Sequence, residues 1–121
     1  MKIKVSTRVV FIFKDYVVKA PISLRGYLQC KQEAYIWEKY NHLNVLCELL
    51  SYKNGIVRMK RYELLKELNY EAVQDVKDKI KEFDFYMCDL YKPCNWGMDE
   101  NGKHILIDYG INEEISKMYN L

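Results

Sequence analysis

Two polar residues near the C-terminal end of the chain have the types and spacing of ligands for a metal ion. Asn95 and Asp108 flank an expected β-hairpin, which would bring both side chains to one end of it. Amide and carboxylate oxygens are hard ligands of the kind that Mg²⁺ prefers, and the ion keeps its other positions for water and phosphate. Gly110 follows Asp108 closely and would allow a sharp turn that aims the carboxylate inward. The sequence therefore predicts a magnesium site here, although a plain hairpin with a polar end is the alternative.

A second candidate pair consists of Lys19, on a strand, and Glu33, on the helix that follows. Lys19 ends the run Tyr16-Val17-Val18-Lys19, whose apolar neighbours could place its ammonium group in a dry cleft. Glu33 lies at the border of the apolar stripe of its helix, whereas Glu38 lies further round toward solvent. We therefore expect Lys19 to pair with Glu33 and not with Glu38. The alternatives are a solvent-facing lysine on an edge strand and an ordinary solvated helix acid.

The strands that must position these residues are marked by alternating apolar residues and by turn residues. β-Branched and aromatic residues at period two mark the N-terminal run, and Pro21 ends the second strand because it has no N–H to donate. Asn54-Gly55 between two apolar runs is a strong hairpin signal. The predicted strands cover residues 3–13, 16–20, 45–50, 56–60, 96–98 and 104–107. Because they come as hairpins, the sheet should be antiparallel and the class α+β.

Helices are predicted between these strands. Ser23 can cap a helix that runs to about Asn41, and Trp37 should be buried on its apolar stripe. That stripe is formed by Tyr27, Cys30, Ala34 and Trp37. The remaining helices are expected over residues 62–68, over 70–83 with the stripe Val73, Val76, Ile80 and Phe83, and from a cap at Asn112 to Tyr119.

The order of these elements, with the polar residues at their ends, resembles a protein kinase. Tyr16-Val17-Val18-Lys19 is similar to the kinase V-A-I-K strand. Asp89-Leu90 with Asn95-Trp96-Gly97, and then Ile107-Asp108-Tyr109-Gly110, resemble the D-L-x-x-x-N-W-G and I-D-Y-G segments of small kinase-like proteins of phages and bacteria. The resemblance implies an ATP and Mg²⁺ site with catalytic Lys19, Glu33 and Asp89, cofactor-binding Lys19, Met59 and Arg61, and metal-binding Asn95 and Asp108.

The sequence departs from the kinase pattern at three places. Asp89 and Asn95 have five residues between them, one more than in H-R-D-x-x-x-x-N, and Met87 and Cys88 occupy the His and Arg positions. Residues 1–18 contain no glycine, so a Gly-rich loop is not expected. Only eleven residues follow Gly110, so the activation segment and the substrate-binding helices should be missing.

Two functions from different classes follow from this resemblance. The first is an ATP-dependent phosphotransferase that uses the residues given above. The second is a catalytically inactive kinase-like binding protein, such as a phage-type inhibitor of a host defence protein, which would act by docking. Its contact surface could be the basic strand face formed by Arg58, Lys60, Arg61 and Tyr62.

The length and composition limit the number of domains, the binding partners and the compartment. The 121 residues suffice for a single domain, with an N-lobe-like part over 1–62 and a reduced C-lobe-like remnant over 63–121. A formal net charge of +2 gives no case for nucleic-acid or membrane binding. The spacing of the four cysteines does not support a zinc site, and reduced thiols, with no signal-peptide core, predict a cytoplasmic protein.

Overall fold

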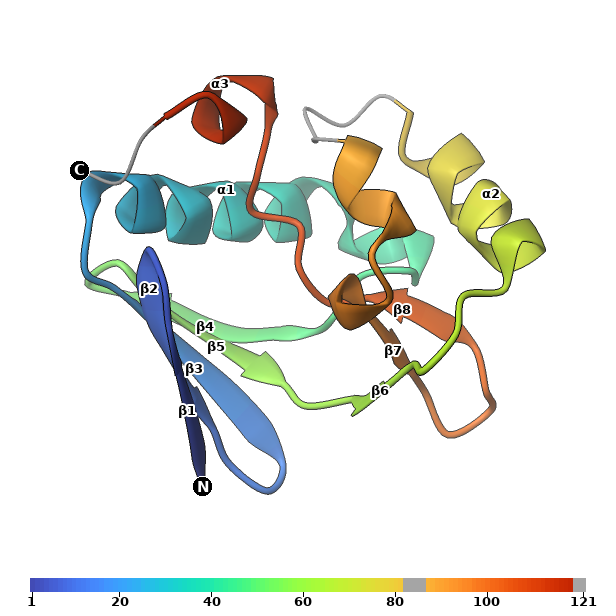
Figure 1. The fold of residues 1–121 in the computed structure, drawn as a ribbon, viewed down its shortest axis with the longest axis horizontal. Coiled ribbons are helices and arrows are strands. Elements are labelled where there is room, and N and C mark those ends of the chain that lie inside the picture. Colours follow the sequence, from blue (N-terminus) through green and yellow to red (C-terminus); the bar gives the residue numbers. More distant parts are fainter. Residues whose placement is uncertain (82–86, 119–121) are drawn as a thin grey trace.

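The computed structural model describes residues 1–81 and 87–118 and has two antiparallel sheets, which confirms the α+β prediction (Figure 1). The first sheet has five strands in the order β1-β2-β3-β5-β4, and the second has three in the order β6-β7-β8. The strands of the first sheet are β1 (Lys2–Val5), β2 (Arg8–Ile12), β3 (Tyr16–Pro21), β4 (Leu49–Lys53) and β5 (Ile56–Lys60). Those of the second are β6 (Glu63–Leu64), β7 (Trp96–Met98) and β8 (His104–Leu106).

The N-terminal run is folded back on itself, so the prediction of one strand over residues 3–13 is wrong. β1 and β2 form an antiparallel pair in which Lys4 lies opposite Val10, and the chain reverses at Ser6 and Thr7. Neither Gly nor Pro marks this reversal, and Val5, Thr7 and Val9 preserve the alternation of a single strand. The correction adds an edge strand to the sheet.

The helix α1 (Leu24–Tyr40) begins at Ser23, whose side chain accepts a hydrogen bond from the Gly26 N–H, as the sequence predicted. Of the predicted stripe, however, only Cys30 is among the buried residues of the helix. Tyr27 is exposed and Trp37 is only partly buried against the core. The fully buried residues of α1 include polar side chains, which an apolar stripe does not reveal. They are Gly26, Gln29, Cys30, Glu33 and Ile36.

The link between the two sheets runs through residues 45–47, which the sequence assigned to a strand of the first hairpin. β4 begins only at Leu49, after this segment. Leu46 instead forms an isolated parallel bridge with Leu106 of β8. The Cys47 N–H donates to the Leu106 carbonyl, and the Leu106 N–H donates to the Val45 carbonyl, both at 2.8 Å. The second sheet is thereby fixed against the first by backbone hydrogen bonds.

Residues 62–68 do not form the predicted helix. Glu63 and Leu64 form β6 and pair with Met98 and Gly97 of β7. The Leu65 N–H then donates to the Trp96 carbonyl at 3.2 Å. Although this segment is rich in helix formers, its pairing with β7 and the packing of its apolar side chains on the core outweigh that propensity.

The remaining helices cover the second sheet and α1. The helix α2 (Tyr70–Lys79) buries Val73 and Val76 as predicted, but it ends before the predicted residue 83, with Ile80 as its C-cap. Phe83 itself lies outside the described residues. The loop expected near Asp89 contains the short 3-10 helices η2 (Met87–Tyr91) and η3 (Pro93–Asn95), and η1 (Asn41–Leu43) follows α1. The helix α3 (Glu113–Ser116) is capped by Asn112 as predicted and lies against α1 on the side away from the sheet (Figure 1). The end predicted for this helix, Tyr119, lies outside the described residues.

Candidate functional site

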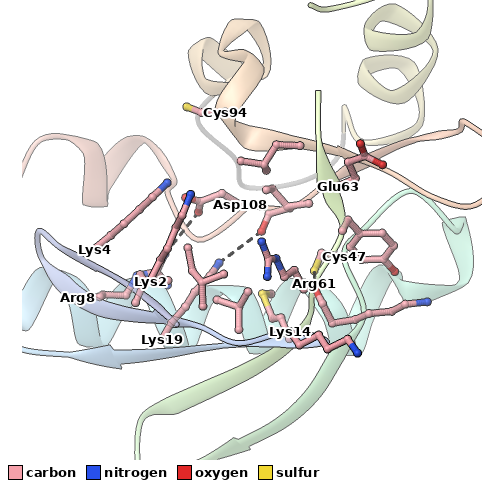
Figure 2. A pocket seen from close by; sticks show the side chains of 18 residues that line it. Lys2, Lys4, Arg8, Lys14, Lys19, Cys47, Arg61, Glu63, Cys94 and Asp108 are labelled. Atoms are coloured by element: carbon pink, nitrogen blue, oxygen red, sulfur yellow. Dashed lines mark hydrogen bonds and ion pairs between the residues drawn. The ribbon is translucent and has the colours of Figure 1, made fainter. Parts of the chain in front are cut away.

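A cavity of about 610 Å³ opens beside the five-stranded sheet, and the segment around Asp108 forms part of its opposite wall (Figure 2). Seven of its lining side chains are cationic and two are acidic, so the cavity attracts anions. The cationic residues are Lys2, Lys4, Arg8, Lys14, Lys19, Lys60 and Arg61. Apolar side chains such as Val17, Met59 and Ile107 complete the lining.

The strand register explains why so many of these side chains reach the cavity. Lys4 lies opposite Val10, and Val10 lies opposite Lys19, so these three form a row across β1, β2 and β3. A second row, two residues along each strand, runs from Lys2 through Ile12 and Val17 to Met59. Side chains two residues apart on a strand lie on the same face of the sheet, so both rows point to the cavity side.

Lys19 contacts Glu33, as the sequence predicted. Its ammonium nitrogen lies 2.7 Å from Glu33 Oε2 and 3.4 Å from the Ile107 carbonyl oxygen. Glu33 is completely buried rather than at the border of the helix face, and Glu38 is exposed. The lysine side chain is only 9% exposed, so the ion pair is shielded from water and its geometry is well fixed.

Arg8 is a second buried cation at the same carboxylate, and no sequence motif pointed to it. Its Nη1 bonds to Glu33 Oε1 and lies 3.6 Å from the Cys30 sulfur, and its Nη2 lies 3.5 Å from Asp108 Oδ1. Burial by itself would lower the pKa of Arg8, but the charges of Glu33 and Asp108 raise it above its ordinary value. Arg8, Lys19, Glu33 and Asp108 therefore form a network of balanced charge, which we call the buried quartet.

Asp108 is the most exposed of the three quartet members that line the cavity, with a side chain that is 39% exposed. Burial alone would raise the pKa of this carboxyl group. The positive charges of Lys19 and Arg8 and a hydrogen bond from the Gly110 backbone outweigh burial and hold the pKa below its ordinary value. Asp108 is therefore ionised at neutral pH and presents a hard oxygen ligand to the cavity.

The two residues after Asp108 hold this segment in place. The Tyr109 hydroxyl is buried and donates to the Cys47 carbonyl at 2.8 Å. A Cβ atom on Gly110 would lie 2.6 Å from the Gln29 carbonyl oxygen and 2.8 Å from Glu33 Cγ. Glycine is required at position 110 by this close approach to α1, rather than by the sharp turn that the sequence suggested.

Asp89 and Asn95 are not among the described side chains that line the cavity. The Asp89 carboxylate accepts a hydrogen bond from Lys92 Nζ at 2.9 Å, and only 8% of its side chain is exposed. Asn95 Nδ2 donates to the Asp89 carbonyl at 3.0 Å, and the Asn95 carbonyl accepts from the Ile107 N–H at 2.9 Å. Asn95 thus ties the Asp89 segment to the strand end that carries Asp108.

Met59 and Arg61, the two other predicted cofactor-binding residues, both line the cavity. Met59 is 1% exposed and packs in the core at the end of the row that contains Val17. Arg61 Nη1 donates to the Phe13 carbonyl at 2.8 Å, and the Arg61 N–H donates to the Asp15 carbonyl at 3.1 Å. Arg61 thereby joins the turn between β2 and β3 to the segment between β5 and β6.

Of the two predicted metal ligands, Asp108 lines the cavity and Asn95 does not. Asp108 supplies an exposed, ionised carboxylate. Asn95 Nδ2 donates to the Asp89 carbonyl, and Asn95 Oδ1 accepts a hydrogen bond from the Cys94 thiol at 3.9 Å. Across residues 1–81 and 87–118, no group of three His, Cys, Asp or Glu side chains could hold a metal on its own. Asp108 suits Mg²⁺, which commonly binds through one or two protein carboxylates and phosphate oxygens.

Comparisons with known proteins agree with the fold. No protein-family model and no curated protein matches this chain. Among solved structures, a co-crystal structure of WbdD and a kinase inhibitor aligns with a TM-score of 0.64 and 18% sequence identity. The alignment covers 91% of this chain and 32% of the WbdD chain, so this chain spans about a third of that protein. The chain has a protein-kinase-like fold, and the similarity at this identity concerns the fold alone.

The sequence analysis missed four cationic residues of the cavity, namely Lys2, Lys4, Arg8 and Lys14. Lys4 and Arg8 fall on the single strand predicted over residues 3–13, and Lys2 precedes it, which hid the fact that β1 and β2 fold back beside Lys19. A strand of eleven residues is longer than the usual five or six, and that length was the available signal of a reversal.

In the part of the chain that the structure describes, no helix has the length and apolar character needed to cross a membrane.

Proposed function

We propose that this chain binds a nucleoside triphosphate in the cavity, with the phosphates near Lys19 and Asp108 and the base against Met59. The observation that carries the proposal is the placement of Lys19, an ammonium group held by a helix carboxylate at the wall of a cationic cavity. A strand lysine oriented by a helix glutamate is the arrangement with which kinase sites hold nucleotide phosphates. Val17 and Met59 from the sheet, and Ile107 from the opposite wall, offer apolar contacts to a base.

Asp108 would hold Mg²⁺ at the phosphates, and Asn95, which does not line the cavity, could act as an accessory ligand only if its side chain left the Asp89 loop. The bound ion would neutralise charge on the phosphate oxygens. The protein's own part is to keep Asp108 ionised and aimed at the cavity, through Lys19, Arg8 and the Gly110 backbone. Bound magnesium should therefore increase the affinity for ATP by way of Asp108.

We propose that phosphoryl transfer by this chain is weak or absent. A general base must lie within hydrogen-bond reach of the hydroxyl that it deprotonates. The Asp89 carboxylate instead accepts a hydrogen bond from Lys92, and Asp89 does not line the cavity. Asp89, proposed as the kinase-type base, would have to leave Lys92 before it could act.

Calorimetric titration with ATP, with and without Mg²⁺, tests this proposal. Binding should be measurable, and Asp108→Ala should remove the increase that Mg²⁺ causes, because the ion loses its carboxylate. Asp89→Asn should leave ATP binding unchanged. The absence of binding to the folded wild-type protein would refute the nucleotide site, and phosphoryl transfer that Asp89→Asn abolishes would refute the proposal of weak turnover.

A kinase-like binding protein, such as an inhibitor of a host protein, is the second candidate, and the position of Asp89 favours it. The basic surface predicted for such docking is divided in the structure. Arg58 lies over the Tyr16 ring at 4.8 Å, whereas Lys60 and Arg61 line the cavity. If docking is the function, Arg58→Glu should weaken capture of the partner and Asp89→Asn should not. The single domain with an N-lobe-like part over residues 1–62 and a reduced C-lobe-like remnant over 63–121 stays a prediction, as does the cytoplasmic location.

A further inference from the structure

We infer that Lys2 and Lys4 on β1 bind the terminal phosphates of the nucleotide and replace the missing glycine-rich loop, so that the triphosphate binds even without a divalent metal. This inference rests on the nucleotide binding proposed above. It assigns a ligand-binding role to an edge strand whose four residues are all exposed.

The positions of the two lysines support this role. Lys4 lies in the same cross-strand row as Lys19, two strands away, which corresponds to about 10 Å between their backbones. Both Lys2 and Lys4 line the cavity, and their side chains extend toward Asp108 (Figure 2). A flexible lysine side chain can span half of that separation, so one triphosphate could contact Lys19 and a β1 lysine together.

The charges of these lysines are not used by the protein itself. Arg8 and Lys19 are bound to Glu33, and Arg8 also approaches Asp108. Among the ion pairs of the described residues, none involves Lys2 or Lys4. Their ammonium groups are therefore available to an anion, at the end of the cavity where the buried quartet lies.

The turn between β1 and β2 cannot supply the backbone donors of a glycine-rich loop. The Ser6 N–H already donates to the Arg8 carbonyl at 3.0 Å. The Thr7 carbonyl accepts hydrogen bonds from Ser23 Oγ at 2.9 Å and from the Ile22 N–H at 3.2 Å. A Cβ atom on Gly26 would clash with the same carbonyl, so the turn is packed directly on α1. With one backbone donor of the turn already used and the turn packed on α1, we assign the contacts to the terminal phosphates to side chains.

The double variant Lys2→Gln/Lys4→Gln tests this inference by calorimetric titration in EDTA. It keeps the length of both side chains and removes two charges. Affinity for ATP should fall by roughly tenfold for each lysine, because each would form a charge-assisted hydrogen bond to phosphate. Affinity for AMP should change by less than about threefold, since AMP lacks the terminal phosphates.

A matched control is Lys53→Gln/Lys66→Gln, which removes two exposed lysines that do not line the cavity. Its affinity for ATP should stay within about twofold of the wild type, because distant exposed charges are screened. Circular dichroism and thermal unfolding should show that both double variants are folded, as expected for exposed positions.

The outcomes separate this inference from the proposed function. If the wild type binds ATP in EDTA and the β1 variant binds equally well, the inference is refuted and the nucleotide site stands. If the wild type binds ATP only with Mg²⁺, the metal-independent role of the lysines is refuted. If the wild type binds ATP under neither condition, the nucleotide site and this inference both fall.

Discussion

Replacing Glu33 with glutamine should destabilise the protein, because two buried cations would lose the carboxylate that they share. Glu33 is fully buried, and Arg8 and Lys19 are only 5% and 7% exposed. Glutamine keeps the size and one acceptor oxygen but removes the negative charge. The perturbation is thus electrostatic and leaves little empty volume.

The expected loss follows from the cost of an uncompensated buried charge. Breaking a buried ion pair on one side typically costs about 3–5 kcal/mol. Asp108 remains 3.5 Å from Arg8 and can partly offset the lost charge, so about 3 kcal/mol is expected. This is a large part of the roughly 5–15 kcal/mol that stabilises a typical domain. It corresponds to a decrease in Tm of about 10 °C for a chain of this size.

Urea unfolding followed by tryptophan fluorescence would measure this loss, since Trp96 is completely buried. The matched control is Glu38→Gln on the exposed side of the same helix, which should change the free energy of unfolding by less than about 0.5 kcal/mol. In a double-mutant cycle, Arg8→Met combined with Glu33→Gln should cost less than the sum of the single changes, because the two groups contact each other.

A small effect would refute this reasoning. If Glu33→Gln lowered the free energy of unfolding by less than about 1 kcal/mol, Glu33 would not hold two buried cations. Additive effects of Arg8→Met and Glu33→Gln would show that the two side chains are not coupled. Either result would also weaken the case for Lys19 as an oriented phosphate ligand.

Further predictions concern the segment after β8 and the thiols. Gly110→Ala should cost about 1–3 kcal/mol in urea unfolding, because the new Cβ would lie 2.6 Å from the Gln29 carbonyl oxygen; full stability would contradict that contact. Burial raises the pKa of Cys47 to about 12, so iodoacetamide at pH 8 should modify exposed Cys94 and spare Cys47 in peptide mapping. Asp108 has a lowered pKa, so its contribution to stability is present above its ordinary pKa of 3.8 and is lost as pH falls below it. Asp108→Asn should therefore reduce the difference in unfolding free energy between pH 7 and pH 3, and an unchanged difference would contradict the shift.

Signals that depend on neighbouring residues were read correctly from the sequence. Asn54 and Gly55 both adopt positive φ, which is why this dipeptide marks a tight hairpin. Ser23 and Asn112 cap the helices that they were expected to cap. The contact between Lys19 and Glu33 was predicted from the apolar neighbours of Lys19 on its strand and from the position of Glu33 beside the apolar stripe of the next helix. The burial of Glu33 was underestimated.

The features that were missed depend on tertiary contacts. The reversal at Ser6 and Thr7 is held by α1, through the hydrogen bond from Ser23 and the close approach of Gly26, and no turn residue marks it. Arg8 belongs to the site only because this reversal places it beside Glu33. The helix predicted over 62–68 is absent because β7, about thirty residues later in the chain, pairs with this segment.

The two sets of charges in the cavity should have separable roles. Arg8 and Lys19 are neutralised within the buried quartet, so these charges mainly hold β2, β3, α1 and the Asp108 segment together. The excess positive charge of the cavity comes from exposed residues, of which Lys2 and Lys4 lie near Asp108 (Figure 2). Removing charge from the quartet should therefore reduce stability as well as affinity, since Lys19 and Asp108 also line the cavity. Removing charge from β1 should reduce affinity for anions while Tm stays the same or rises slightly, since like charges at an edge repel one another. A β1 variant that lost stability and affinity together would show that the lysines belong to the structural network, and would count against this division of roles.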